Sequence, residues 1–191
     1  DSLAATLYTP NQPLVADREK PAPIIVILHG LGGSSESGYV QSSADYLISQ
    51  NHRVLLIDFR GAGRSAEHCD QVYHPGRTED IAALLDATDE ETKHRLRQAA
   101  VVVAGFSLGC RVLLNSLADS EFETSAPTFA AAVGAGDVRP TDTSVGILGA
   151  VTISAPLDLA STSKCLSRPT RWPYRKYLLK KIKTKRWLVF S

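Results

Sequence analysis

The sequence lacks methionine altogether and has only three cysteines among its 191 residues. Because even an initiator methionine is missing at Asp1, we expect the natural protein to begin upstream of this residue. Cys69, Cys110 and Cys165 are odd in number and show none of the C-x-x-C or Cys/His spacings of metal sites. They favour reduced thiols in a reducing compartment. We therefore expect a cytoplasmic protein with no metal.

Long hydrophobic runs are also absent. No apolar segment approaches the roughly 20 residues that cross a bilayer, and the N-terminus lacks the basic and then apolar layout of a secretory signal. A hydrophobic share of 43% and a charged share of 21% are ordinary for globular proteins and do not favour a disordered or fibrous chain. We expect a soluble globular protein, membrane-associated only if an N-terminal anchor is missing from this sequence.

Acidic residues are missing from residues 159–191, which contain ten lysines and arginines. The other 11 basic residues face 20 acidic ones in residues 1–158, so the two parts carry net charges of +10 and −9. Two interpretations follow: peripheral membrane contact through the basic tail, or a solvated helix face whose balancing acidic residues lie on a segment that is not in this sequence. Such a helix would place Tyr174, Leu178 and Ile182 on one face. No nucleic-acid partner is expected, because no binding motif accompanies the charge, and nothing signals an oligomeric state.

Apolar runs alternate with helical patterns along the chain. Four runs indicate buried strands of a parallel sheet: Ile24–Leu28, Val54–Ile57, Val101–Val103 and a less regular run that ends at Ser154. Three sets of apolar residues between and after them have helical spacing: Val40, Ala44, Leu47 and Ile48; Ile81, Leu84 and Leu85, behind Thr78; and Cys110, Leu113, Leu114 and Leu117. The alternation predicts an α/β fold, a doubly wound and mostly parallel sheet with helices on both faces, incomplete at its C-terminus.

A serine between two glycines follows the third strand. Residues Gly105 to Gly109 read G-F-S-L-G and match G-x-S-x-G, with a predicted strand before the motif and a predicted helix after it. In this context the pattern is typical of a nucleophile elbow, a sharp turn in which bulky neighbours would clash. We expect Ser107 to be the catalytic nucleophile, with Gly105 and Gly109 meeting the steric requirement. The amide of Leu108, at the helix N-terminus, would stabilise an oxyanion.

The loop after the first strand, "LHGLGGSS", is expected to supply a second oxyanion donor. Gly30 and Gly32 let the backbone turn under the site, and the amide of Leu31 is the candidate donor. His29 precedes this turn. We interpret its imidazole as a support for the loop, with a catalytic base as the alternative.

A base for the serine is not evident from the sequence. In this kind of fold the triad follows the chain order Ser, then Asp or Glu, then His, but all five histidines precede Ser107. His74 is a surrogate base if the short chain is complete. Asp158 is a candidate acid, but no histidine follows it in the sequence to receive its hydrogen bond. Its alternative role is to start a helix or to brace a loop.

These motifs together resemble the α/β-hydrolase superfamily, and more narrowly its YheT-like branch of esterases. The segments "HGLGGSSES", "DFRGAGRS", "YHPGRTEDI", "GFSLGCRVLL" and "SAPLDL" occur in the family's order, within residues 24–182. The resemblance implies Ser107 as nucleophile and the amides of Leu31 and Leu108 as the oxyanion hole, with no metal or organic cofactor. Complete members continue through a lid and two further strands that carry the acid and the histidine, so it also implies a C-terminally truncated chain.

We therefore expect a serine hydrolase that acts on carboxylic esters, of short- to medium-chain acyl groups or of lipids, through an acyl-enzyme on Ser107. Activity would be impaired without the acid and the histidine. The alternatives are a non-catalytic hydrolase-like binding protein and an acyltransferase that uses the same serine. Two regions are expected: a hydrolase core in residues 1–158 and the start of a basic lid or cap region in residues 159–191.

Overall fold

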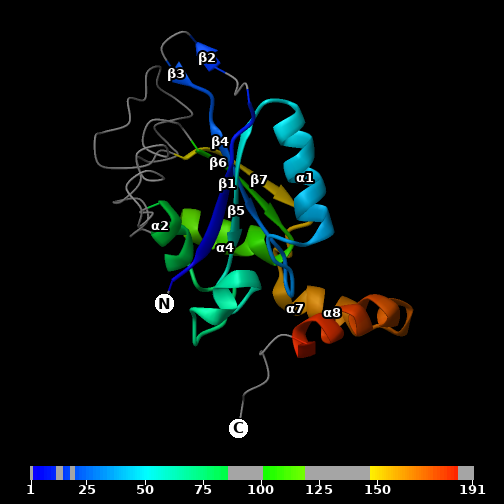
Figure 1. Cartoon of the computed structure of the whole chain (residues 1–191). Helices are drawn as coiled ribbons and strands as arrows, with labels where there is room; N and C mark the ends of the chain where they lie inside the picture. The colour runs from blue at the N-terminus through cyan, green and yellow to red at the C-terminus, as the bar shows by residue number, and fades with distance from the viewer. Residues whose placement is uncertain (1, 12–14, 18–19, 86–100, 119–146, 185–191) are drawn as a thin grey trace.

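The fold is built on a five-stranded sheet in the order β1-β5-β4-β6-β7 (Figure 1). The computed structural model describes residues 2–11, 15–17, 20–85, 101–118 and 147–184. Within the sheet, β1 runs antiparallel to β5 and the other neighbours are parallel. The five strands are β1 Ala4–Tyr8, β4 Ile24–Leu28, β5 Arg53–Asp58, β6 Val101–Phe106 and β7 Ile147–Ile153. A separate antiparallel ribbon joins β2 Val15–Asp17 and β3 Lys20–Pro21.

Side chains of the central strands pack alternately on the two faces of the sheet, as the pleat requires. Ile27 of β4 packs with Val40 of α1 on one face. Its neighbour Leu28 packs with Ile81 of α2 and Leu113 of α4 on the other. The predicted mostly parallel sheet with helices on both faces is confirmed. The three helices are α1 Gly38–Ser49, α2 Glu79–Leu85 and α4 Leu108–Ala118.

Strand β7 corrects the prediction of four buried strands. Ile147 is buried, but Leu148, Val151 and Ile153 are 52%, 48% and 41% exposed. Within the described residues β7 lies at the edge of the sheet, with β6 as its one paired neighbour. The prediction is wrong here because burial depends on what packs over a strand, whereas an apolar run reports only the strand's own sequence.

Three short helical elements follow β7 beyond the carboxyl ends of the parallel strands (Figure 1). They are α7 Leu159–Leu166, η2 Pro169–Arg171 and α8 Trp172–Thr184, and a further 3-10 turn, η1 Gly63–Glu67, follows β5. None of the helices in the described ranges is both long and apolar enough to cross a membrane. The carboxyl ends of β4 and β6, together with α7 and α8, surround the site described next.

Candidate active site

Ser107 lies at the corner between β6 and α4, where the backbone is forced into a left-handed conformation. Its φ angle is +50°, a value that non-glycine residues rarely adopt. A Cβ on Gly105 would lie 2.8 Å from the amide nitrogen of Cys110, and one on Gly109 would lie 2.6 Å from the carbonyl oxygen of His29. Both flanking positions therefore need glycine for the corner to close.

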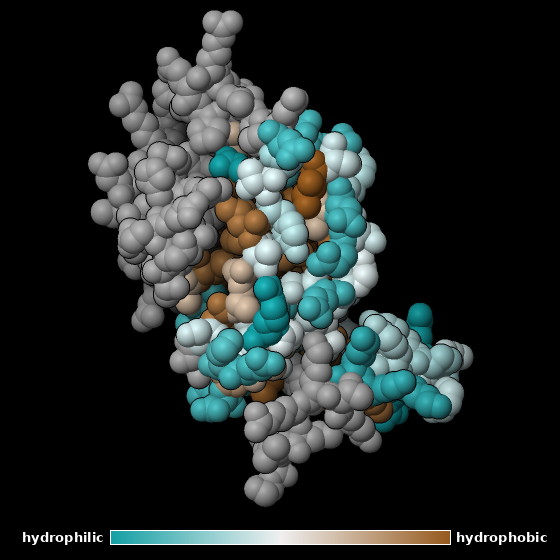
Figure 2. Space-filling view, in the orientation of Figure 1, coloured by the Kyte–Doolittle hydropathy of each residue, from teal (hydrophilic) through white to brown (hydrophobic). Residues whose placement is uncertain are grey.

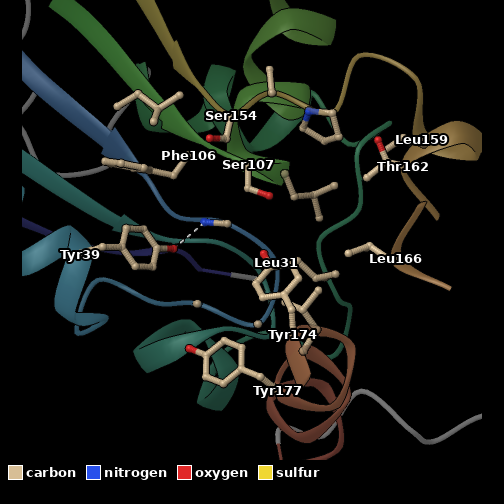
Figure 3. Close-up of a pocket in the computed structure, with 18 of the residues that line it drawn as sticks. Leu31, Tyr39, Phe106, Ser107, Ser154, Leu159, Thr162, Leu166, Tyr174 and Tyr177 are labelled. Atoms are coloured by element: carbon tan, nitrogen blue, oxygen red, sulfur yellow. Dashed lines mark hydrogen bonds between the residues drawn. The ribbon is translucent and has the colours of Figure 1, made fainter. Parts of the chain in front are cut away.

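Two hydrogen bonds hold the backbone of this corner. The Ser107 amide donates to the carbonyl oxygen of Ile153, at the end of β7, over 2.9 Å, and the Cys110 amide donates to the carbonyl of Ser107 over 3.1 Å. The Cys110 thiol donates to the carbonyl of Gly105 over 2.9 Å, and burial raises its pKa. Cys110 is thus a packed, protonated thiol beneath the corner, and the hydroxyl of Ser107 points into the pocket (Figure 3).

Two tyrosines hold the loop that follows β4. The Tyr39 hydroxyl accepts the amide hydrogen of Gly30 over 2.8 Å (Figure 3). The Tyr73 hydroxyl donates to the carbonyl of Gly30 and accepts from the amide of Gly32, each over 2.9 Å. Burial raises the pKa of both phenols, so both stay protonated near neutral pH. The loop therefore has a fixed position opposite Ser107.

The amide of Leu31, in the same loop, is available to donate a hydrogen bond to a ligand. Gly30 and Gly32 donate to the tyrosines, and the Gly33 amide donates to the carbonyl of Gly30 over 3.0 Å. Among the described residues, the amide of Leu31 has no hydrogen-bond acceptor. A Cβ on Gly30 would lie 3.1 Å from the Cβ of Ser107, so the loop passes directly beside the serine.

Leu31 and Leu108 both line the pocket that contains Ser107. Leu108 is the first residue of α4, where amide groups have no acceptor within the helix and the helix dipole favours negative charge. The structure thus brings together the serine and the two residues whose amides the sequence proposes as oxyanion donors. Backbone amides in such an arrangement stabilise charge that develops on an acyl oxygen.

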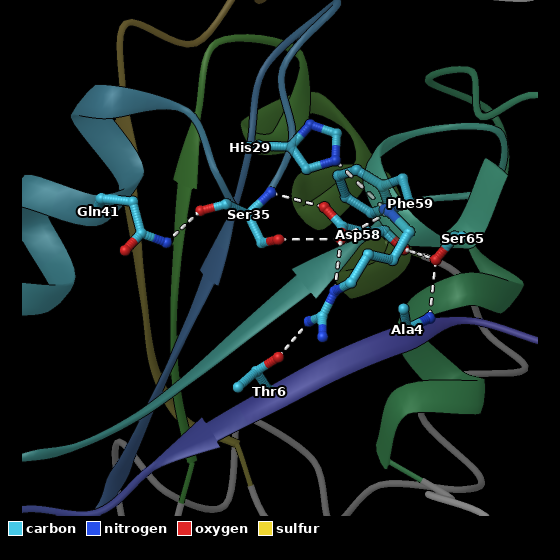
Figure 4. Close-up of polar contacts among 9 residues, drawn as sticks. Ala4, Thr6, His29, Ser35, Gln41, Asp58, Phe59 and Ser65 are labelled. Atoms are coloured by element: carbon cyan, nitrogen blue, oxygen red, sulfur yellow. Dashed lines mark hydrogen bonds and ion pairs between the residues drawn. The ribbon is translucent and has the colours of Figure 1, made fainter.

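His29 is fully buried, and its imidazole joins the loop after β4 to the loop after β5. The amide of Phe59 donates to its Nε2 over 3.2 Å (Figure 4), which leaves Nδ1 to donate to the carbonyl of Gly30 over 2.9 Å. Its ring also packs edge-on against Phe59 and Tyr73. With Nε2 already engaged as an acceptor, the imidazole cannot take a proton from Ser107.

A pocket of about 740 Å³ opens at Ser107 between the loop after β4 and the two helices α7 and α8 (Figure 3). Most of its lining is apolar or aromatic, and none of the described residues that line it is a histidine or an acid. Side chains from α7 and α8 form its outer wall: Leu159, Thr162, Ser163, Leu166, Tyr174, Tyr177 and Leu178.

The two surrogate triad residues lie elsewhere. His74 is exposed, and its Nδ1 accepts the amide hydrogen of Gly76 over 3.2 Å. Asp158 caps α7, where its carboxylate accepts the amide and the hydroxyl hydrogens of Ser161 over 3.0 and 2.6 Å. These bonds lower the pKa of Asp158, so the helix-start role is the one the structure shows. His94 lies outside the described residues.

A polar cluster behind the site was not foreseen from the sequence. The Asp58 carboxylate accepts the amide hydrogen of Ser35 over 2.6 Å and its hydroxyl hydrogen over 2.9 Å (Figure 4). It also accepts the amide hydrogen of Arg64 over 3.2 Å. A Cβ on Gly63 would lie 2.3 Å from this carboxylate. The cluster joins the loops after β4 and β5, and the segments that supply it, "GGSSES" and "DFRGAGRS", were visible as motifs.

Comparison with known proteins agrees with this geometry. Residues 23–132 match the family described as the alpha/beta hydrolase fold. The chain belongs to the α/β hydrolase fold family. The chain is 27% identical over 161 residues to the putative esterase YheT of Escherichia coli. It is also 32% identical over 115 residues to the medium-chain fatty acid ethyl ester synthase/esterase 2 of Saccharomyces cerevisiae.

These α/β hydrolase matches differ in how much of each protein they cover. The YheT match spans 84% of this chain and 40% of YheT, and the yeast match spans 60% and 25%. Among solved structures, an α/β serine hydrolase without a lid from Xanthomonas campestris is 19% identical, covers 99% of this chain and 91% of that one, and has a TM-score of 0.52. The predicted resemblance to YheT-like esterases is confirmed, and the chain spans less than half the length of these two curated relatives.

Proposed function

We propose that this chain carries the nucleophile and the oxyanion hole of a carboxylic ester hydrolase, with Ser107 as the acyl-accepting residue. The observation that carries the proposal is the corner at Ser107, whose hydroxyl faces a pocket that Leu31 also lines. The Leu31 amide has no acceptor among the described residues. Relatives named as esterases support the reaction class. A left-handed, non-glycine residue of this kind is typical of functional sites.

The proposed reaction has two steps. The Ser107 Oγ attacks the acyl carbon of the ester, and the negative charge on the former carbonyl oxygen is stabilised by the amides of Leu31 and Leu108. The C–O bond to the alcohol then breaks, which leaves an acyl-serine that water hydrolyses to the free acid. Both steps need a group that accepts and returns the proton, and this group comes from outside the described pocket lining. In its absence we expect slow turnover.

The pocket favours an ester with an apolar acyl group. Leu159 and Leu166 of α7 (Figure 3) and Leu178 of α8 line it. Its volume of about 740 Å³ is within the usual range of small-molecule sites. No described charged group lines it, so an anionic or cationic acyl chain would lose its hydration without gaining a partner. We propose medium-chain or lipid esters as the substrate class.

A fluorophosphonate probe tests the nucleophile. We expect slow covalent labelling of the wild-type chain, no labelling of Ser107→Ala, and labelling at the wild-type rate in Ser154→Ala. Ser154 is a matched control, because it also lines the pocket and also has a left-handed backbone, with φ of +58°. Equal labelling of Ser107→Ala and the wild type would overturn the proposal. A wild type that binds esters but never reacts would identify a non-catalytic binding protein instead.

Acyl transfer to an alcohol is the second candidate, because the yeast relative is named as both an ester synthase and an esterase. The acyl-serine would then be attacked by an alcohol in place of water. Product analysis with and without added ethanol separates the two. Hydrolysis predicts free acid under both conditions, whereas a transferase gives mainly the ethyl ester when ethanol is present.

A further inference from the structure

Helix α8 has two faces of different character. On the inner face, Tyr174, Tyr177 and Leu178 recur at i, i+3 and i+4 and line the pocket. The backbone of α8 is close to the loop after β4, since a Cβ on Gly32 would lie 2.9 Å from the Cβ of Lys181. The inner face is therefore part of the site already described.

The outer face of α8 carries two basic residues and two apolar ones. Trp172, Arg175, Lys176 and Leu179 recur at i, i+3, i+4 and i+7, and all four are exposed. The exposed fractions of Trp172 and Leu179 are 58% and 43%. The Lys176 Nζ lies 4.9 Å from the centre of the Trp172 ring, so the cation sits beside the indole.

The charge around this face has one sign. Residues 159–184 contain eight lysines and arginines and no acidic residue, and in Figure 2 the lobe formed by α7 and α8 is mainly hydrophilic. An excess of positive charge on a surface attracts an anionic partner. An exposed tryptophan and leucine in the same stripe fit a partner with apolar material beneath its charged surface. A lipid bilayer has that layering, whereas the phosphate backbone of a nucleic acid does not.

We propose that the outer face of α8 docks on a membrane surface that contains anionic lipids. Arg175 and Lys176 would contact the headgroups, while Trp172 and Leu179 would enter the interfacial layer. Because the opposite face of the same helix lines the pocket, docking places the site beside the bilayer. The proposal does not depend on ester hydrolysis, and binding is measured without turnover.

Vesicle binding of the full chain tests this proposal. Trp187→Phe leaves Trp172 as the single tryptophan of the sequence, and its emission reports on the outer face. With phosphatidylcholine vesicles that contain phosphatidylserine, we expect a blue shift and binding that weakens as salt is added. Pure phosphatidylcholine should give neither. Arg175→Gln and Lys176→Gln should each weaken binding about fivefold, the equivalent of about 1 kcal/mol per basic residue.

Controls separate docking from general charge and from catalysis. Ser42→Glu lowers the net charge by the same one unit as Lys176→Gln, but on the exposed face of α1, and should bind as the parent does. Ser107→Ala should also bind unchanged, whatever its effect on labelling by the probe. Equal loss in Ser42→Glu and Lys176→Gln would overturn the proposal, as would equal binding to both vesicle types. Preferential binding to single-stranded RNA, lost in Lys176→Gln, would identify a nucleic-acid surface instead.

Discussion

At the residue scale, Tyr73 is one of the two tyrosines that hold the loop after β4. The Tyr73 hydroxyl donates to the carbonyl of Gly30 and accepts the amide hydrogen of Gly32, so it sets the turn on both sides of Leu31. The ring is buried against His29 and stacks on Phe59. Tyr73 touches no reacting atom. We expect it to act as a positioning residue, through the loop that contains Leu31.

Replacement of Tyr73 by phenylalanine tests this role. The change leaves the buried Gly32 amide without an acceptor, which should lower the free energy of unfolding by about 1–3 kcal/mol. The carbonyl of Gly30 keeps its bonds from Gly33 and His29. Displacement of Leu31 should slow labelling of Ser107 by up to about 100-fold. Urea unfolding and labelling rates measure the two effects.

Tyr46→Phe is the matched control for this substitution. Tyr46 is on α1 and is 66% exposed, so removal of its hydroxyl should change neither quantity. If Tyr73→Phe loses stability but labels at the wild-type rate, the tyrosine supports the fold without positioning the oxyanion donor.

At the scale of single elements, the start of α7 should respond to acid. Asp158 accepts two hydrogen bonds from Ser161 as the helix cap, and these lower its pKa in the folded chain. A folded pKa below the ordinary value of about 4 means that the stabilisation is complete above that value and is lost as the pH falls through the folded pKa. NMR titration of Asp158 and of the α7 amide signals should show the first turn loosening in this acidic range.

Asp158→Asn separates titration from capping. Asparagine also caps helices but has no proton to bind in this range, so the α7 signals of this variant should not change with acid. An Asp158 pKa at or above the ordinary value would contradict the capping interaction.

Elements with a strong local signal were predicted from the sequence. The apolar runs gave β4, β5 and β6, and helical spacing gave α1 and α4, because these residues bury the same side chains that set the pattern. Strand β1 was not predicted, since Ala4–Tyr8 forms a strand by pairing with a distant one, β5. The burial of β7 was predicted wrongly for the same reason: it depends on distant partners.

Parts of the candidate site were also predicted from the sequence, whereas others depend on residues that are distant in the chain. The G-x-S-x-G motif, with a predicted strand before it and a predicted helix after it, was enough to predict the corner at Ser107, although Gly109 is also needed for close approach to the distant backbone of His29. The hydrogen bonds from Gly32 to Tyr73 and from Ser35 to Asp58 join loops that meet only in the folded chain. Both residues lie in segments that stood out as motifs, but a motif does not tell which carbonyl or amide its side chain reaches.

At the scale of the whole molecule, we expect self-association through β7, which is an edge strand among the described residues. Val151 is 48% exposed on a strand with β6 as its one described neighbour, and an exposed apolar edge strand can pair with another copy. Val151→Lys should raise the monomer fraction at high concentration, as measured by light scattering. Tyr46→Lys adds the same charge on a helix and should have a smaller effect. Equal effects of the two would point to net charge alone.

The bond from the Ser107 amide to the carbonyl of Ile153 also fixes an order of events during folding. The two residues are separated in the sequence by α4 and by residues 119–146, so the corner is completed only after β7 has emerged from the ribosome and paired with β6. A nascent chain that ends before residue 147 has the serine but not the hydrogen bond that holds it. Reactivity towards esters should therefore appear only in nascent chains long enough to include β7.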